Sequence, residues 1–196
     1  MPSLKDLRNR INSVKQTRKI TSAMKLVASS KLKRAQEQAE RARPFAEKMA
    51  SMLANLGRSV QGMPEAPALL AGSGKDETHL LVVATADRGL CGAFNTSIVR
   101  GAVRRIRRLQ SDGKQVRIIC VGRKGYDLLR REHADLIDAY VDGVVGKKRL
   151  EYADAEKIAT MITDRFDAGE IDAATIIFNR FKTAISSELT FQQLVP

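Results

Sequence analysis

The chain has 196 residues, of which 43% are apolar, 29% are charged and 5% are aromatic. This composition is ordinary for a folded protein and excludes a disordered chain, and the length allows one core plus an appendage. The formal net charge is +12, and residues 1–57 supply +9 of it. Such local positive charge attracts nucleic acid, an anionic membrane surface or an acidic protein surface, and composition does not choose among them.

The first 57 residues carry the pattern of one long helix. Apolar residues fill 13 of 16 positions in an unbroken alternation of three- and four-residue steps. This is the pattern of a coiled-coil seam, because side chains about 3.5 residues apart return to one edge of a helix. At about 1.5 Å per residue the helix would be roughly 80 Å long and must project from a small domain. The expected seam is Leu4, Leu7, Ile11, Val14, Ala28, Leu32, Ala35, Ala39 and Ala42, followed by Ala46, Met49, Leu53 and Leu56.

The seam is interrupted near its middle. Arg18, Thr21 and Lys25 occupy seam positions there, while apolar side chains such as Met24 lie one residue, or about 100°, around the helix. We therefore expect the contacting partner to change at this break. The alanines that follow allow a second helix to approach closely, and Pro44 is expected to kink the helix or remove one hydrogen bond.

This helix needs a partner, because a lone helix cannot stabilise an apolar stripe in water. Parallel homodimers prefer Ile or Leu at the seam, so a helix of another kind fits the alanine-rich part better. Residues 58–196 contain no such helix, and the sequence ends on a strand pattern. The partner is therefore expected on another chain or in a continuation of this one. Independently of the seam, Arg8 to Arg34 includes nine basic residues and no acid, so a negatively charged partner is expected.

Glycines and prolines over residues 58–78 predict a connecting loop. Beyond it, strand and helix patterns alternate, which predicts a mostly parallel sheet with helices on both faces. The last two strands are close in sequence and should pair antiparallel at an edge. The expected fold class is thus α/β, with a Rossmann-like domain (79–196) mounted on the coiled-coil helix (1–57). The expected strands are 80–85, 116–121, 136–141, 173–181 and 189–195, and the expected helices are 96–109, 124–132 and 152–166.

The loop Ala86–Asn95 follows the first strand and opens a helix, where a nucleotide fold holds phosphate. The G-x-x-G spacing of Gly89 and Gly92 is neither a dinucleotide fingerprint nor a P-loop. Cys91 at a helix start could be a nucleophile, but neither His79 nor His133 is placed as its base. A small residue filling a tight turn fits better.

The remaining polar side chains favour surface roles. The acidic pairs Asp135 with Asp138 and Asp154 with Glu156 lie at the edges of expected elements, without an apolar pocket to separate their pKa values. The arginines between 100 and 108 favour an exposed helix face. The two cysteines form neither a disulfide framework nor a metal cluster, and a reducing compartment fits them best. We expect no catalytic residue, no cofactor, no metal and no membrane span.

Two separated motifs carry a resemblance to a known family. The first is KITSAMKLVA at Lys19–Ala28, followed by Arg43 and Pro44, and the second is DRGLCGAFN at Asp87–Asn95. On these residues the chain closely resembles the gamma subunit of F-type ATP synthases. The resemblance covers the whole chain, although residues 58–78 and the second half of the α/β domain match only in pattern.

The resemblance implies a non-catalytic central rotor stalk. Its N-terminal helix would pair with a long C-terminal helix, absent from this sequence, in an antiparallel shaft along the axis of a hexamer of alpha and beta subunits. The α/β domain would lie beside the epsilon subunit and above the ring of c subunits. Proton flow would turn ring and shaft, and the shaft would shift each beta subunit between states of different nucleotide affinity.

The resemblance also implies where the shaft contacts the hexamer. The expected contact residues are Arg18, Met24, Lys25, Arg88 and Cys91. The expected location is the cytoplasmic face of a bacterial inner membrane, or the matrix side in a mitochondrion, and the lack of a leading transit segment favours the first.

Two alternatives stay open from the residues alone. In a nucleic-acid-binding coiled coil, the run from Arg8 to Arg34 would track phosphates as a homodimer. That interpretation leaves the loop Asp87–Asn95 unexplained, and the resemblance implies no nucleic acid partner. A small Rossmann-like enzyme would bind nucleotide through its α/β domain.

Overall fold

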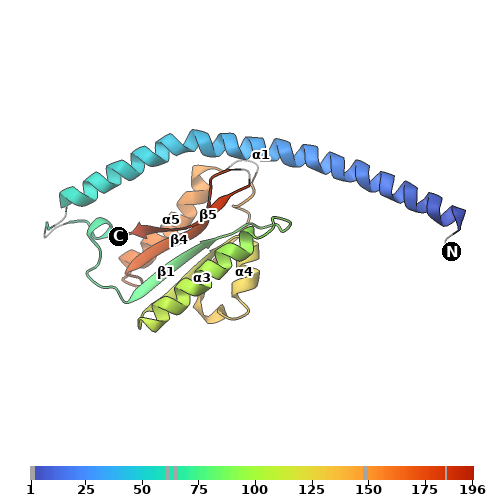
Figure 1. Cartoon of the computed structure of the whole chain (residues 1–196). Coiled ribbons are helices and arrows are strands. Elements are labelled where there is room, and N and C mark those ends of the chain that lie inside the picture. The colour runs from blue at the N-terminus through green and yellow to red at the C-terminus, as the bar shows by residue number, and fades with distance from the viewer. Residues whose placement is uncertain (1–2, 61, 64–65, 148–149, 184) are drawn as a thin grey trace. The chain divides into compact units, whose positions relative to one another are not determined.

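The computed structural model describes residues 3–60, 62–63, 66–147, 150–183 and 185–196. The chain divides into two compact units, Met1–Asn55 and Leu56–Pro196. The first unit consists of most of helix α1 (Leu4–Val60), which Figure 1 shows in colours from blue to teal. The helix is continuous through Pro44 and extends three residues beyond the expected end at 57.

Helix α1 begins with a reciprocal cap. The Ser3 hydroxyl donates to the Asp6 carboxylate at 2.8 Å, and the Asp6 N–H donates to Ser3 Oγ at 3.2 Å. The hydrogen bonds from Ser3 lower the pKa of Asp6. The cap satisfies donors that the first helical turn leaves without partners, and it places a negative charge at the positive end of the helix dipole.

The second unit contains a five-stranded sheet in the order β3-β2-β1-β4-β5. Strand β1 (Thr78–Ala84) pairs in parallel with β2 (Gln115–Val121) and β4 (Ala173–Phe181). Strand β3 (Ile137–Val141) extends the parallel part beyond β2, and β5 (Ser187–Val195) pairs antiparallel with β4. The predicted mostly parallel sheet with an antiparallel edge hairpin is confirmed.

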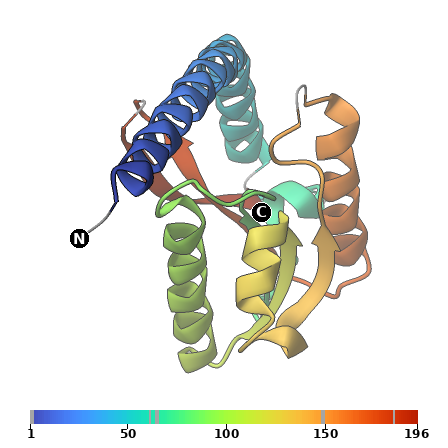
Figure 2. The ribbon, with the colours of Figure 1, turned by 90° about the vertical axis from the view of Figure 1, so that its right-hand side faces the viewer.

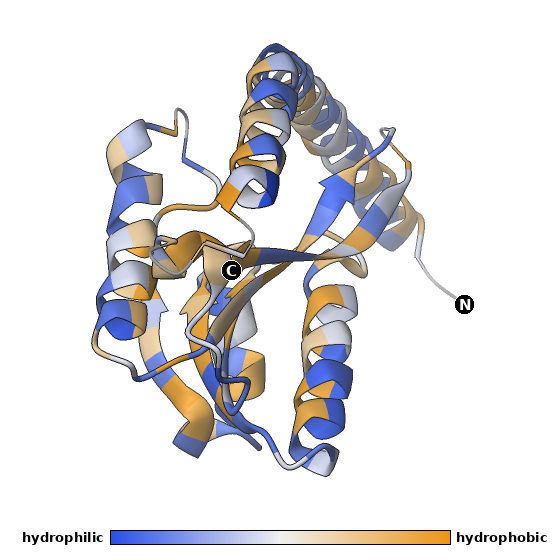
Figure 3. Ribbon diagram, turned by 90° about the vertical axis from the view of Figure 1, so that its left-hand side faces the viewer, coloured by the Kyte–Doolittle hydropathy of each residue, from blue (hydrophilic) through white to orange (hydrophobic). Residues whose placement is uncertain are grey.

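Helices cover both faces of this sheet, as predicted (Figure 2). Helices α3 (Phe94–Ser111) and α4 (Arg123–Leu129) pack on one face, and α5 (Tyr152–Asp167) packs on the other. Figure 3 shows hydrophobic residues along the strands, whereas α3 is divided between hydrophobic and hydrophilic residues. The segment between α1 and β1 also holds the short helix α2 (Ala68–Ala71), and a 3-10 turn, η1 (Ala134–Leu136), precedes β3.

The central strand explains why the apolar run near residue 80 is continuous rather than alternating. Leu81 and Val83 pack against α3, and Leu80 and Val82 pack on the α5 face; all four are fully buried. A parallel strand covered on both faces has no solvent side, so every position is apolar. Helix α3 completes one face with buried side chains at helical spacing, namely Ile98, Ala102, Ile106 and Leu109.

A buried carboxylate joins the segment before β1 to the start of β4. Asp172 accepts hydrogen bonds from the backbone N–H groups of Glu77 and Thr78, both at 2.9 Å, and from Ser73 Oγ at 3.0 Å. The N–H of Thr78 is the largest cause that lowers the pKa of Asp172. A buried charge is tolerated here because several donors replace its water shell.

Over the described ranges, no helix combines the length and the apolar character that crossing a bilayer requires.

Candidate functional site

The loop Ala86–Asn95 lies at the edge where the parallel strands β1, β2 and β3 end. In a doubly wound sheet this edge is where ligands and partners usually bind, because the loops that leave the strands are free to vary. The loop leaves β1 after Thr85 and leads into α3.

Asp87 fastens this loop to the two neighbouring strands. Its carboxylate accepts from the N–H of Arg123, at the start of α4, at 2.9 Å. It also accepts from the N–H of Gly143, just beyond β3, at 3.1 Å. The N–H of Lys124 adds a bond to the carbonyl of Ala86 at 3.1 Å. One side chain thus holds the ends of three strands in a fixed relation.

Asn95 closes the loop from its other end. The side chain is buried, and its Oδ1 accepts from the N–H of Ala86 at 2.9 Å. Its Nδ2 donates to Cys91 Sγ at 3.1 Å and to the carbonyl of Arg88 at 3.5 Å. Residues 88–93 between these anchors are exposed, and Leu90 adopts a left-handed φ of 60° with its side chain in solvent. The loop is therefore a fixed, outward-facing feature.

The residues packed beneath the loop, Thr85 and Gly122, are so close together that no side chain could be added at Gly122. Thr85 is fully buried; its N–H donates to the carbonyl of Val121 at 2.8 Å, and its Oγ1 accepts from the N–H of Gly125 at 2.8 Å. Gly122 has a φ of 98°, and a Cβ there would lie 2.0 Å from the carbonyl oxygen of Thr85. Glycine is thus required for both its backbone conformation and the close approach of β1 to the turn after β2.

The predicted loop residues Arg88 and Cys91 both lie exposed on this loop. Neither histidine comes near them: His79 belongs to β1, whose other end leads into the loop, and His133 precedes η1. A hollow of about 490 Å³ beside the loop is lined by groups of both signs, namely Asp87, Arg88, Arg123, Asp142 and Lys147, together with Ala86, Gly143, Val145 and Gly146. The described residues contain no group of three or more His, Cys, Asp or Glu side chains able to hold a metal ion.

One member of each acidic pair noted in the sequence, Asp138 and Asp154, forms an ion pair in the structure. Asp138 lies 3.3 Å from Arg117 and 3.5 Å from Arg165 in ion pairs. Asp154 pairs with Lys147 at 2.5 Å and, with Glu151, forms the capping box of α5. A lysine hydrogen bond is the largest cause that lowers the pKa of Asp154.

On α1, the break in the seam exposes both polar and apolar groups. Arg18, Thr21 and Lys25 are all exposed, and the Thr21 hydroxyl donates back to the carbonyls of Thr17 and Arg18 at 3.0 and 3.1 Å. Met24 is 58% exposed. The Thr21 side chain is thus turned onto its own helix, whereas Met24 presents apolar surface to solvent.

The seam residues of α1 are exposed as well. No described residue of this helix is buried, and Leu4, Ile11 and Val14 are 77%, 54% and 63% exposed. Burying one such side chain fully contributes about 1.5–3 kcal/mol. A stripe of this length therefore gains substantial stability from a second helix.

Comparison with known proteins agrees with these features. A family model described as ATP synthase matches residues 3–196. The ATP synthase gamma chains of Mesorhizobium japonicum and Sinorhizobium medicae are 54% and 53% identical over all 196 residues, which span 66% and 67% of those proteins. The chain thus spans about two thirds of the length of these relatives.

One solved structure is similar in both fold and sequence. It is the Tetrahymena thermophila mitochondrial ATP synthase central stalk with its c-ring, with a TM-score of 0.66, 31% identity, and coverage of 90% of this chain and 72% of that chain. The matches define the class of the protein, a component of ATP synthase. Within that class, the chain belongs to the gamma chain family, and the resemblance carried by the two motifs is confirmed.

The motif Asp87–Asn95 includes all four residues, but only Arg88 and Cys91 were predicted to have a role, as contact residues; the structure shows that Asp87 and Asn95 hold the loop in place. A signal for both was present. An aspartate directly after a strand and an asparagine at the start of a helix are residue types that bond to nearby backbone in turns and caps. Their partners were not visible, because Arg123 and Gly143 are distant in sequence.

Proposed function

We propose that the chain is the non-catalytic central stalk, or rotor, subunit of an F-type ATP synthase. In this role it couples proton-driven rotation of a membrane ring to conformational change at catalytic beta subunits. The observation that carries the proposal is helix α1: 57 residues with a long apolar stripe, interrupted only between Arg18 and Lys25, and no buried residue, in a chain of the gamma chain family. A helix of this kind fits a shaft that works inside an assembly.

The seam of α1 is proposed to pair with a long antiparallel helix from the C-terminal part of a gamma chain. The alanines from Ala28 to Ala42 suit a close approach of the two helices. In this division, residues 1–57 form the shaft helix, 58–78 connect it, and 79–196 form the α/β domain.

The proposed contacts to the alpha and beta hexamer are Arg18, Met24, Lys25, Arg88 and Cys91. All five are exposed, and the last two lie on a loop held rigid by Asp87 and Asn95. Reversing a two-state equilibrium from 1:99 to 99:1 takes about 5.5 kcal/mol of differential binding. Several contacts of about 1 kcal/mol each supply that amount only if their positions are fixed, which supports a rigid loop in this role.

The α/β domain is proposed to contact the epsilon subunit and the ring of c subunits, at the foot of the shaft. The similar Tetrahymena structure is one of a central stalk with its c-ring. The protein would then be peripheral to the membrane, on the cytoplasmic face of a bacterial inner membrane or the matrix side in a mitochondrion. Membership of the gamma chain family leaves the nucleic-acid-binding alternative without support.

The first test captures the protein through an antibody from detergent-solubilised membranes of its source and assays the bound fraction for Mg-ATP hydrolysis. Co-purifying activity is expected because the chain would be part of the complex. Capture of the chain without any ATPase activity would reject the rotor assignment.

A second test concerns the contacts, in membrane vesicles that carry the whole enzyme. Lys25→Ala and Arg88→Ala are expected to lower the ratio of protons pumped to ATP hydrolysed. Lys48→Ala and Arg100→Ala are matched controls, because they remove exposed residues of the same type from α1 and from the α/β domain. Unchanged coupling in all four variants would reject the proposed contacts while leaving the rotor assignment intact.

A further inference from the structure

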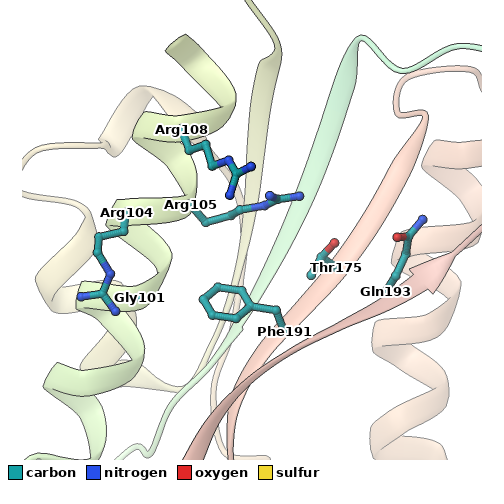
Figure 4. Close-up of a pocket in the computed structure, with 7 residues that line it drawn as sticks. All are labelled: Gly101, Arg104, Arg105, Arg108, Thr175, Phe191 and Gln193. Atoms are coloured by element: carbon teal, nitrogen blue, oxygen red, sulfur yellow. The ribbon is translucent and has the colours of Figure 1, made fainter. Parts of the chain in front are cut away.

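A second hollow lies between α3 and the strands β4 and β5 (Figure 4). Its volume is about 410 Å³, and its lining combines three arginines with one aromatic ring and two polar side chains, namely Arg104, Arg105, Arg108, Phe191, Thr175 and Gln193. None of these residues belongs to the loop Ala86–Asn95 or to the hollow beside it. None of them is among the residues proposed above to contact the alpha and beta hexamer.

One glycine of α3, Gly101, lies in the lining of this hollow and close to β5. A Cβ at Gly101 would lie 2.5 Å from Leu189 Cδ2, so a larger residue there would require the Leu189 side chain of β5 to shift. Gly101, Arg104, Arg105 and Arg108 follow the three- and four-residue spacing that places side chains on one helix face. Figure 4 shows Arg105 and Arg108 reaching from α3 toward the strands, with the Phe191 ring lying toward the helix.

The arginines of α3 lack acidic partners. The helix contains five arginines and no acid, whereas residues 56–196 together carry a net charge of only +3. Among the described residues, no carboxylate forms an ion pair with any of these five. Elsewhere in this unit, by contrast, Asp76, Asp138 and Asp154 all have basic partners. Helix α3 thus carries five positive charges without an ion pair among the described residues, although Asp76 and Asp112 line an adjoining hollow with Arg105 and Arg108.

We propose that this hollow is a docking site for an acidic segment of another polypeptide. The segment would place carboxylates on Arg104, Arg105 and Arg108, and one apolar side chain against Phe191, which is 45% exposed. Guanidinium groups bind carboxylates in pairs of parallel hydrogen bonds, and in a hollow these bonds are less screened than on an open surface.

The chemistry of the lining favours a polypeptide over other anions. Arg104 and Arg108 are about 6 Å apart along the helix axis, so their charges suit a partner with several separate anionic groups rather than one phosphate. A bilayer is flat and does not enter a concave site of this size. An apolar side chain beside acidic ones also matches Phe191 next to the arginines, a pairing that a phosphate backbone does not offer.

The test uses the full chain and a short fluorescent peptide of glutamate and leucine, with binding followed by fluorescence anisotropy. The double variant R104Q/R108Q is expected to weaken binding about fivefold, since it removes two exposed ion pairs of intermediate strength. The variant R100Q/R107Q is the matched control: it removes the same charge from exposed positions of the same helix that do not line the hollow. It is expected to change binding less than twofold.

The basic helix α1 also attracts acidic peptides, so the binding position must be mapped. A peptide that carries a benzophenone group is expected to cross-link to the segments around Arg104 and Phe191. Equal losses in the two double variants, cross-links confined to α1, or equal binding of a glutamine-leucine peptide would each overturn the proposal. Tighter binding of single-stranded DNA or of phosphatidylglycerol vesicles through Arg104 and Arg108 would also overturn it, by assigning the hollow to another class of partner.

Discussion

Replacing Asn95 with alanine is expected to loosen the loop that carries Arg88 and Cys91. The substitution removes the acceptor of the Ala86 N–H at 2.9 Å and the donor to Cys91 Sγ and the Arg88 carbonyl. Because alanine fills none of these roles, the half-buried Ala86 N–H is left without its protein partner.

The magnitude follows from these bonds. An unsatisfied buried donor costs about 1–3 kcal/mol, and the bonds to sulfur and to a carbonyl at 3.5 Å add little. We therefore expect a loss of about 2 kcal/mol in the free energy of unfolding of the α/β domain. This corresponds to about 1 M in a urea midpoint, or about 7 °C in melting temperature for a domain of this size.

Tyrosine fluorescence reports this domain alone. The three tyrosines, Tyr126, Tyr140 and Tyr152, all lie in it, and the chain has no tryptophan. Thr96→Ala is the control, because the Thr96 hydroxyl is exposed and donates only to the Ala93 carbonyl at 3.1 Å. It should cost less than about 0.5 kcal/mol. If Asn95→Ala shifts the urea midpoint no more than Thr96→Ala does, Asn95 does not hold the loop.

Three further outcomes are expected. In the native chain one thiol should react with a disulfide reagent, because Cys91 is exposed whereas Cys120 is buried and burial raises its pKa to about 12. Folding lowers the pKa of Asp172, so its carboxylate stabilises the folded chain at pH values above its unfolded pKa of about 4. This stability is lost as the pH falls through the folded pKa. Wild type should therefore lose more stability on acidification than Asp172→Asn. Gly122→Ala should lower the free energy of unfolding by at least about 3 kcal/mol, and Gly113→Ala should lower it by about 1–2 kcal/mol.

Each of these outcomes has a control. Urea should expose the second thiol, and two reactive thiols in the native chain would contradict the burial of Cys120. Equal pH dependence of urea midpoints between pH 7 and 3 in wild type and Asp172→Asn would show that this carboxylate is not linked to folding. Gly113 shares a positive φ, 75°, but a Cβ added there would meet nothing within 4 Å. Equal losses at Gly122 and Gly113 would therefore show that a clash with Thr85 does not destabilise Gly122→Ala.

Much of the fold could be predicted because it depends on patterns among residues that are close in sequence. The three- and four-residue steps from Leu4 to Leu56 specify a helix with an apolar edge, and the run Leu80–Val83 specifies a strand covered on both faces. Alternation of such segments is enough to predict a parallel sheet. The seam also shows that α1 needs a partner, since no lone helix stabilises such a stripe.

Only part of the candidate site could be predicted from neighbouring residues. A turn motif predicts that Arg88 and Cys91 lie on a loop, and exposure of that loop follows. The anchors that make the loop rigid join Asp87 to Arg123 and Gly143, residues 36 and 56 positions away. No periodic pattern contains such pairs.

The sequence by itself determined the long amphipathic helix, the α/β class and the family, because periodicity, turn residues and motifs are local properties of the chain. Only the tertiary structure decided which distant residues meet: Asp87 with Gly143, Asp172 with Thr78, and the arginines of α3 with Phe191. These meetings depend on the strand order β3-β2-β1-β4-β5 and on the register of each pair. Strand order and register result from the packing of all elements of the domain against one another. A short segment of sequence therefore does not determine them.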